Sequence, residues 1–186
     1  DTSNLYESRI CSLPPNSQSN SLAKLMLVNL NNSQDLVSKI NSKTFKVSYF
    51  DKYNQSEFSM RLLLQFVNQL QAICSLKIGE LAVNLTKEVF KSRDYPRNIM
   101  DNYKDFEDYK HDLEQLSNAY SFEVVLVDMS RLPHYRYFEF KSDEISFNIR
   151  IDAGIAHGFR PYKFLKSEEM KFENQIFEIK KYVYHD

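Results

Sequence analysis

Hydrophobic residues recur every three or four positions in two long segments of the chain, as they do along one side of an amphipathic helix. The first segment runs from Glu57 to Cys74, and Ser56 stands in front of it as an N-cap. Its stripe consists of Phe58, Leu62, Phe66, Leu70 and Ile73, widened by Leu63 and Val67. The second segment covers residues 98–119, with Phe106, Tyr109, Leu113, Leu116 and Tyr120 on one side. Its other side is rich in Asp and Glu, which predicts an acidic helix surface exposed to water.

Three segments have the composition of β-strands and alternate with these helices. Thr44 to Phe50 alternates between polar and apolar residues, Gly79 marks a turn, and Glu80 to Leu85 follows as the next strand. Phe122 to Val127 is almost continuously apolar and β-branched, which predicts a strand covered on both faces. Strands that alternate with helices in this order are typical of βαβ units. We therefore predict an α/β fold, with a mixed, mainly parallel central sheet and helices packed on it.

A C-terminal antiparallel hairpin is predicted from Tyr135 to Lys141 and from Glu144 to Asp152. The second arm alternates strictly and places Ile145, Phe147, Ile149 and Ile151 on one face. The residues between the arms, Ser142 and Asp143, are taken as a two-residue turn.

This turn fixes which side chains share a face of the hairpin. It sets Arg136 opposite Ile149 and His134 opposite Ile151, so both polar residues extend the apolar face at one end. A register that differed by one residue would put both of them on the opposite face.

The chain has 186 residues, a length that suits one domain. Residues 1–21 are rich in Ser and Asn and are predicted to form a flexible N-terminal arm or linker, with 22–186 as a single α/β domain. Two segments, 22–30 and 172–184, fit a strand or a helix, and the pattern does not decide between them.

Charge and cysteine content narrow the classes of protein. With 24 Lys and Arg against 25 Asp and Glu, the chain has no net positive charge with which to bind polyanions. A local basic patch is compatible with this balance. Two cysteines cannot form a disulfide framework, so Cys11 and Cys74 are expected to be free thiols in a reducing, cytoplasmic compartment. The most apolar run, Leu62 to Leu76, is too short and too often interrupted by Gln and Asn to span a membrane.

Several cations and imidazoles fall near the end of the predicted hairpin and in the glycine-containing segment that follows it. These candidate ligand-binding residues are His134, Arg136, His157, Arg160 and Lys163. Guanidinium and imidazole groups are suited to holding phosphate, and Gly154 and Gly158 let backbone approach a bound group closely. The sequence therefore predicts a phosphate-binding rim.

Each candidate also has a purely structural explanation. His134 follows a proline and would satisfy a strand end, while Arg136 would form an ion pair with Asp128 or Asp152. His157 between two glycines would be a loop residue without chemistry.

An enzymatic alternative uses some of the same residues. Glu139 and Lys141 match a short metal-dependent nuclease pattern, with Asp128 as a further ligand, and His134 with His157 would supply an acid and a base. No phosphate-binding glycine loop or zinc ligand spacing is present, so we expect no metal and no cofactor.

Residues 44–164 resemble the phospholipase-D-like domain at the C-terminus of MIT (microtubule-interacting and transport) proteins. The similar features are Leu85-Thr86 at a strand end, the long acidic helix, and His134-Tyr135-Arg136 opening a hairpin. The resemblance implies a phospholipase-D-like fold without catalysis, because Arg136 replaces the motif's Lys and Lys141 its Asp. It also implies a homodimer that binds membrane lipid.

We therefore expect a non-enzymatic binding module for a phosphate-bearing ligand, either an anionic lipid head group or a nucleic-acid backbone. It is expected to be a homodimer, to follow an upstream domain in a larger protein, and to be cytoplasmic or peripheral to a membrane. Two alternatives stay open: a phosphodiesterase or nuclease that acts on nucleic acid, and a protein–protein scaffold whose contact face is the acidic helix.

Overall fold

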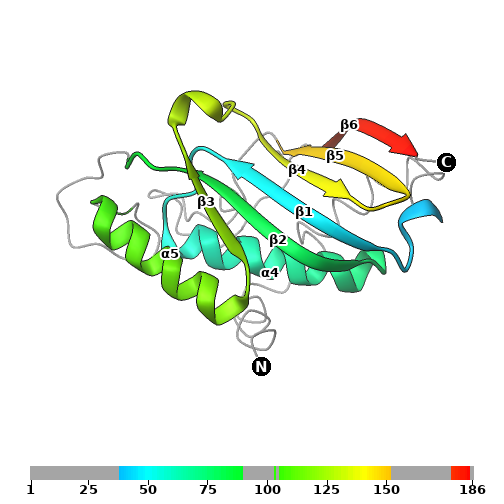
Figure 1. The fold of residues 1–186 in the computed structure, drawn as a ribbon, viewed down its shortest axis with the longest axis horizontal. Coiled ribbons are helices and arrows are strands. Elements are labelled where there is room, and N and C mark those ends of the chain that lie inside the picture. The colour runs from blue at the N-terminus through cyan, green and yellow to red at the C-terminus, as the bar shows by residue number, and fades with distance from the viewer. Residues whose placement is uncertain (1–37, 90–102, 104, 152–176, 185–186) are drawn as a thin grey trace, which may run out of the picture.

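A six-stranded mixed sheet forms the centre of the protein (Figure 1). The computed structural model describes residues 38–89, 103, 105–151 and 177–184. The strands lie in the order β3-β2-β1-β4-β5-β6. Their bounds are β1 Thr44–Asp51, β2 Lys77–Thr86, β3 Glu123–Val127, β4 Arg136–Lys141, β5 Ile145–Ile151 and β6 Phe177–Tyr184. Among the helices of the described part of the chain are α4 Glu57–Cys74, α5 Phe106–Tyr120 and the short 3-10 helix η2 Met129–Arg131.

The first half of the sheet consists of two βαβ units, as predicted. β1 pairs with β2 and β2 pairs with β3 in parallel, with α4 and α5 as the connections. After η2 the chain returns to β1 and adds β4, β5 and β6 as antiparallel strands. The α/β class is therefore confirmed, but the expectation of a mainly parallel sheet is wrong, because three of the five described strand pairs are antiparallel.

Helix α4 forms where the apolar stripe predicted it, over Glu57–Cys74. Ser56 is its N-cap: the Ser56 hydroxyl accepts from the Ser59 backbone N–H at 3.1 Å, and the Ser59 hydroxyl accepts from the Ser56 N–H in return. This capping box satisfies backbone donors that the first helical turn leaves without partners.

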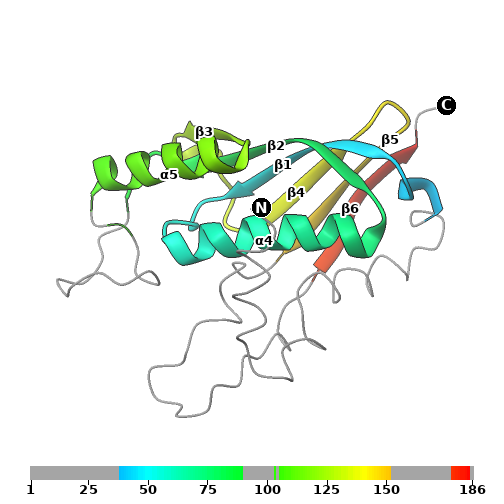
Figure 2. The ribbon, with the colours of Figure 1, turned by 90° about the horizontal axis from the view of Figure 1, so that it is seen from below.

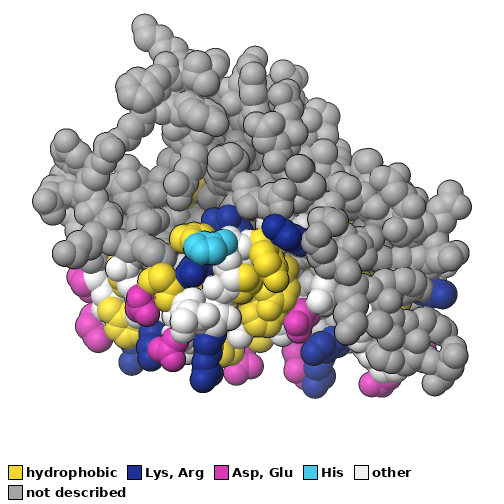
Figure 3. All heavy atoms as spheres, turned by 90° about the horizontal axis from the view of Figure 1, so that it is seen from above, with side chains coloured by type: hydrophobic (Ala, Val, Ile, Leu, Met, Phe, Trp, Pro, Cys, Tyr) yellow, Lys and Arg dark blue, Asp and Glu magenta, His cyan; other side chains and the backbone are white. Residues whose placement is uncertain are grey.

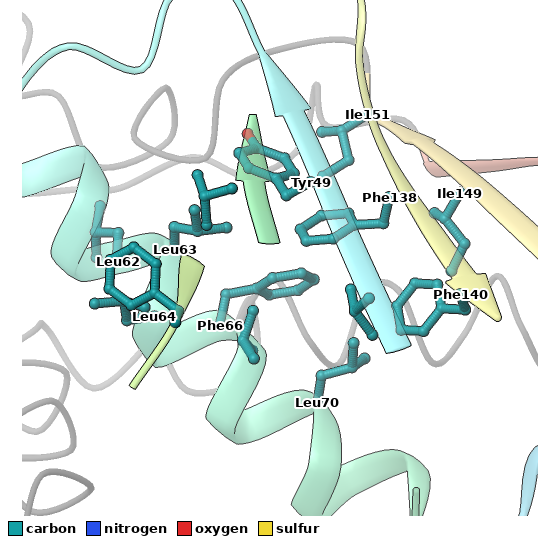
Figure 4. Close-up of a cluster of buried hydrophobic side chains, with 14 of the residues drawn as sticks. Tyr49, Leu62, Leu63, Leu64, Phe66, Leu70, Phe138, Phe140, Ile149 and Ile151 are labelled. Carbon is teal, nitrogen blue, oxygen red and sulfur yellow. The ribbon is translucent and has the colours of Figure 1, made fainter. Parts of the chain in front are cut away.

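The buried stripe of α4 packs on one face of the sheet and forms the hydrophobic core (Figure 4). The Phe66 ring of α4 lies 5.4 Å from the Phe138 ring of β4, and Phe138 lies 4.5 Å from Tyr49 of β1. Each of these three side chains is at most 3% exposed. The core is thus built mainly from aromatic side chains that join α4 to the two central strands.

Helix α5 begins later than predicted but buries the predicted stripe. Asp105 is its N-cap, and its carboxylate accepts from the Asp108 backbone N–H at 2.9 Å. Tyr109, Leu113 and Leu116 are buried, whereas the acidic side is exposed. The helix lies beside β3 and next to α4 (Figure 2). No helix in the described ranges is long and apolar enough to span a membrane.

Two strands differ from their predicted form. β3 is an edge strand, and Glu123 is exposed while the other four residues are only partly buried, so the expectation of burial on both faces is wrong. Gly79 lies inside β2 at a register shift between β1 and β2, and does not mark a turn. A Cβ atom on Gly79 would lie 3.0 Å from Thr44 Cγ2, so the close approach of the two strands favours glycine there.

The hairpin of β4 and β5 forms, but its register differs from the predicted one by two residues. Arg136 lies opposite Ile151, and His134 precedes the strand. The reason is the turn: the Ser142 backbone N–H donates to the Ile145 carbonyl at 2.9 Å, which leaves Asp143 and Glu144 at the tip. The Ser142 hydroxyl also accepts from the Ile145 N–H at 3.0 Å and fixes this turn.

A shift of two residues keeps each side chain on its predicted face, because side chains alternate with period two. Arg136 therefore does share the face of Phe138 and Phe140, as expected. At the C-terminus, β6 decides part of the open 172–184 segment in favour of a strand, while 1–21 and 22–30 lie outside the described residues.

Replacing Phe138 with Ala removes the ring that joins Tyr49 and Phe66. We expect the free energy of unfolding to fall by about 4 kcal/mol, because the substitution leaves a cavity in a closely packed core. Urea unfolding followed by circular dichroism measures this change. Glu114→Ala, on the exposed side of α5, is the control and is expected to change stability by less than about 0.5 kcal/mol. A similar loss in both variants would contradict the prediction.

Cys74, at the end of α4, is a free thiol that is 7% exposed, and its burial raises its pKa to about 11. Because the thiolate is the reactive form, we expect iodoacetamide at about pH 8 to alkylate Cys74 slowly in the folded chain and rapidly in denaturant. Mass spectrometry of the Cys11→Ser variant isolates this thiol. Equal rates in the two states would show that the side chain is accessible.

Candidate functional site

A cluster of polar side chains lies where β1 ends and β4 begins. Asp51, the last residue of β1, is 3% exposed. Its carboxylate accepts from the Tyr49 hydroxyl and from the Tyr53 backbone N–H, each at 2.7 Å. The carboxyl end of a parallel strand is the usual position of ligand sites in open α/β sheets.

The Arg136 guanidinium lies against both Asp51 and Tyr53. Its Nε is 3.4 Å from Asp51 Oδ1, and its central carbon is 4.8 Å from the centre of the Tyr53 ring. Burial raises the pKa of Asp51, and the charge of Arg136 opposes this effect by lowering it. One structural partner of Arg136 is thus Asp51. Of the two predicted partners, Asp128 pairs with Lys87, and Asp152 lies outside the described residues.

His134 completes this cluster from the segment before β4. Its Nδ1 lies 2.7 Å from the Tyr53 hydroxyl, and the two rings are stacked with centroids 6.3 Å apart. Tyr53 therefore contacts the imidazole and the guanidinium at once. We call Asp51, Tyr53, His134 and Arg136 the strand-end cluster.

The loop that carries Tyr53 is held by contacts to other elements. Gln55 is fully buried; its side-chain amide donates to the Glu88 carbonyl after β2, and its own carbonyl accepts from the Tyr103 N–H at 2.9 Å. The Tyr109 hydroxyl of α5 lies 3.5 Å from the Asn54 carbonyl. The position of Tyr53 is therefore determined by β2 and α5 as well as by β1.

A second group of side chains lies on the sheet face opposite α4, which we call the outer face. The Tyr137 ring stacks on Phe50 of β1 with centroids 4.4 Å apart and planes 7° apart. The Arg150 guanidinium carbon lies 4.3 Å from the centre of the Tyr135 ring. The described residues that line a cavity of about 420 Å³ here are Tyr135, Tyr137, Glu139, Asn148 and Arg150.

The molecule seen from above the view of Figure 1 has a histidine side chain next to Lys or Arg and hydrophobic side chains on its surface (Figure 3).

Of the predicted ligand-binding residues, the structure places His134 and Arg136 together around Tyr53. His157, Arg160 and Lys163 lie outside the described residues.

The nuclease pattern has a different geometry. Glu139 and Lys141 form an ion pair with each other at 3.4 Å on the outer face, whereas Asp128 follows β3, which is separated from β4 by two strands, β2 and β1. Within the described part of the chain, no group of three His, Cys, Asp or Glu side chains is positioned to hold a metal ion.

Sequence reasoning missed the partners that build both groups. Asp51 and Tyr53 could have been predicted, because they belong to a polar run between a predicted strand and a predicted helix. Such a run marks the carboxyl end of the strand, where ligand sites usually lie. Tyr135, Tyr137 and Arg150 follow from the alternation of the hairpin, which sends every second side chain to the outer face.

The fold and these two groups define a mixed α/β domain with basic and aromatic side chains gathered at one end of its sheet. One family model matches the chain over residues 16–181, and its description is DEAD/DEAH box helicase YjiV, C-terminal domain. The match covers most of the chain, so the chain belongs to this family. Comparisons with curated proteins and with solved structures gave no match.

This family assignment corrects the resemblance to the phospholipase-D-like domain of MIT proteins, which is wrong. The features that carried it were two- and three-residue sequences and the order of the elements. The homodimer and the lipid ligand were implied by this resemblance, so they are no longer supported by it. The expectation of a larger protein agrees with the family, because its description is that of a domain of a helicase.

Asp51→Asn tests whether burial or the charge of Arg136 has the larger effect on the pKa of Asp51 in the strand-end cluster. The pKa of Asp51 is higher in the folded chain than its ordinary value of 3.8, so its contribution to stability is present at low pH and is lost as the pH rises through the folded pKa. We expect the unfolding free energy of the original chain, relative to that of Asp51→Asn, to fall as the pH rises above about 4. Urea unfolding of both proteins at several pH values measures it; an increase with pH would mean that the ion pair dominates.

Proposed function

We propose that this chain is a non-enzymatic module of a helicase protein that binds the phosphate backbone of nucleic acid at the strand-end cluster. The observation that carries the proposal is the convergence of His134 and Arg136 on Tyr53, beside the carboxyl end of β1. Arg160, Lys163 and His157 are proposed as further contacts of the same backbone.

The chemistry of the cluster suits a phosphate group. A guanidinium carries its N–H donors in a planar fork that matches the oxygens of a phosphate, and Arg136 brings such a fork beside Tyr53 at the end of β1. Asp51 and Tyr53 hold Arg136 from two sides, which reduces the conformational entropy that would be lost on binding. His134 is exposed and adds a ring nitrogen beside the same tyrosine.

The family favours nucleic acid over lipid as the source of the phosphate. A helicase acts on nucleic-acid strands, and an accessory domain that contacts the backbone helps to keep the protein on its substrate. Electrostatic backbone contacts supply affinity without reading the sequence. The division into an arm at 1–21 and a domain at 22–186 is part of this proposal.

Binding to a fluorescein-labelled 15-nucleotide strand, followed by anisotropy at several salt concentrations, tests the proposal. The Asp51→Asn/Arg136→Gln double variant leaves the net charge of the chain unchanged and buries no lone charge. We expect it to bind about five- to tenfold more weakly at low salt, and to lower the slope of log K against log salt by about 0.7. His134→Ala is expected to weaken binding in the same direction.

Two controls make the result specific. Asp51→Asn alone removes the carboxylate that neutralises Arg136, so its binding is expected to be as tight as that of the original chain or tighter. Lys110→Ala removes an exposed cation from α5 and is expected to change affinity by less than about twofold. Binding that does not depend on salt, or equal losses in Lys110→Ala and the double variant, would refute the proposal. Sedimentation with phosphatidylserine vesicles, without binding to the strand, would favour lipid instead.

A further inference from the structure

We infer that the outer-face cavity is a stacking site for an unpaired nucleobase, and that this domain therefore prefers single-stranded to double-stranded nucleic acid. The inference rests on the proposed function, because the same strand would supply the phosphate held by the strand-end cluster. It adds the class of substrate, which the phosphate contacts alone do not distinguish.

The cavity has the size and walls of a site for a small planar group. Its volume of about 420 Å³ falls within the range of roughly 300–1,000 Å³ that is usual for small-molecule sites. Tyr135 is 40% exposed, and its ring centre is 5.7 Å from that of Tyr137, with 51° between the two ring planes. The two rings therefore form an angled platform in which each ring offers its own face, and aromatic faces on a sheet surface are where unpaired bases stack.

The platform is built before any ligand arrives. Tyr137 lies flat against Phe50, which fixes the orientation of its ring, and the Arg150 guanidinium lies over Tyr135. A guanidinium next to an aromatic ring adds a cation that matches the negative charge of a nucleic-acid strand. Ordering costs on binding are therefore small.

Two polar side chains that line the cavity suit the edge of a base. Glu139 and Asn148 lie opposite each other in the β4–β5 register and both line the cavity. An amide both donates and accepts, and a carboxylate accepts, so the pair can serve the amino and carbonyl groups that bases carry. A paired base in a duplex presents neither its open edge nor its face.

The two sites lie at the same end of the sheet because four consecutive residues supply both. His134 and Arg136 belong to the strand-end cluster, whereas Tyr135 and Tyr137 alternate with them and line the outer-face cavity. A nucleic-acid strand that crosses the end of the sheet at the start of β4 meets cationic groups on one face of the sheet and aromatic rings on the other. A duplex satisfies the first contact only.

An abasic strand separates the two contacts without altering the protein. We expect the full 186-residue chain to bind a labelled 15-nucleotide thymidine strand about tenfold more tightly than an abasic strand of equal length and charge, because stacking of one base is lost. Tyr137→Leu keeps an apolar side chain but removes the ring, and is expected to reduce thymidine-strand affinity about tenfold while leaving the abasic strand and a matched duplex unchanged. Tyr137→Phe is the matched control and should bind like the original chain.

Each outcome assigns the failure to one of the two ideas. Salt-dependent binding of both strands with equal affinity would overturn the stacking site and leave the phosphate-binding function intact. Binding to neither strand would overturn the proposed function, and the inference with it. If Tyr137→Leu lowers the midpoint of thermal unfolding markedly, the comparison of the two strands on the original chain decides alone.

Discussion

The carboxylate of Asp51, buried where β1 leaves the sheet, organises the end of the molecule that carries the candidate site. It joins a hydroxyl from its own strand, a backbone donor from the loop that leads into α4, and a cation from β4. Buried charge is costly without such partners, so the three elements must meet in one arrangement. The position of Tyr53, and through it that of His134, follows from this constraint.

Alternation along β4 then divides the surface into two kinds of chemistry. One set of side chains continues inward as Phe138 and Phe140 of the core and ends in a cation beside Asp51. The other set forms the tyrosine and carboxylate wall of the outer face. A single strand thus links the stability of the aromatic core to the geometry of a basic and aromatic surface.

Local patterns predicted the elements well where one physical signal dominated. The apolar stripe and Ser56 gave α4 its bounds, and the alternation of β5 gave the faces of the hairpin. What failed depended on distant partners. Burial of β3 depends on its place at the sheet edge, and the register of β4 depends on the Ser142 turn bonds. The ion pair of Arg136 joins residues 85 positions apart, which no local pattern encodes.

The Ser142 turn also sets which slips of pairing this hairpin can tolerate. A slip of two residues would leave every isoleucine of β5 on the buried face of the sheet. A slip of one residue would exchange those isoleucines for Asn148 and Arg150, opening the hydrophobic interior to an amide and a cation. The interior therefore opposes odd slips of the two strands far more strongly than even ones.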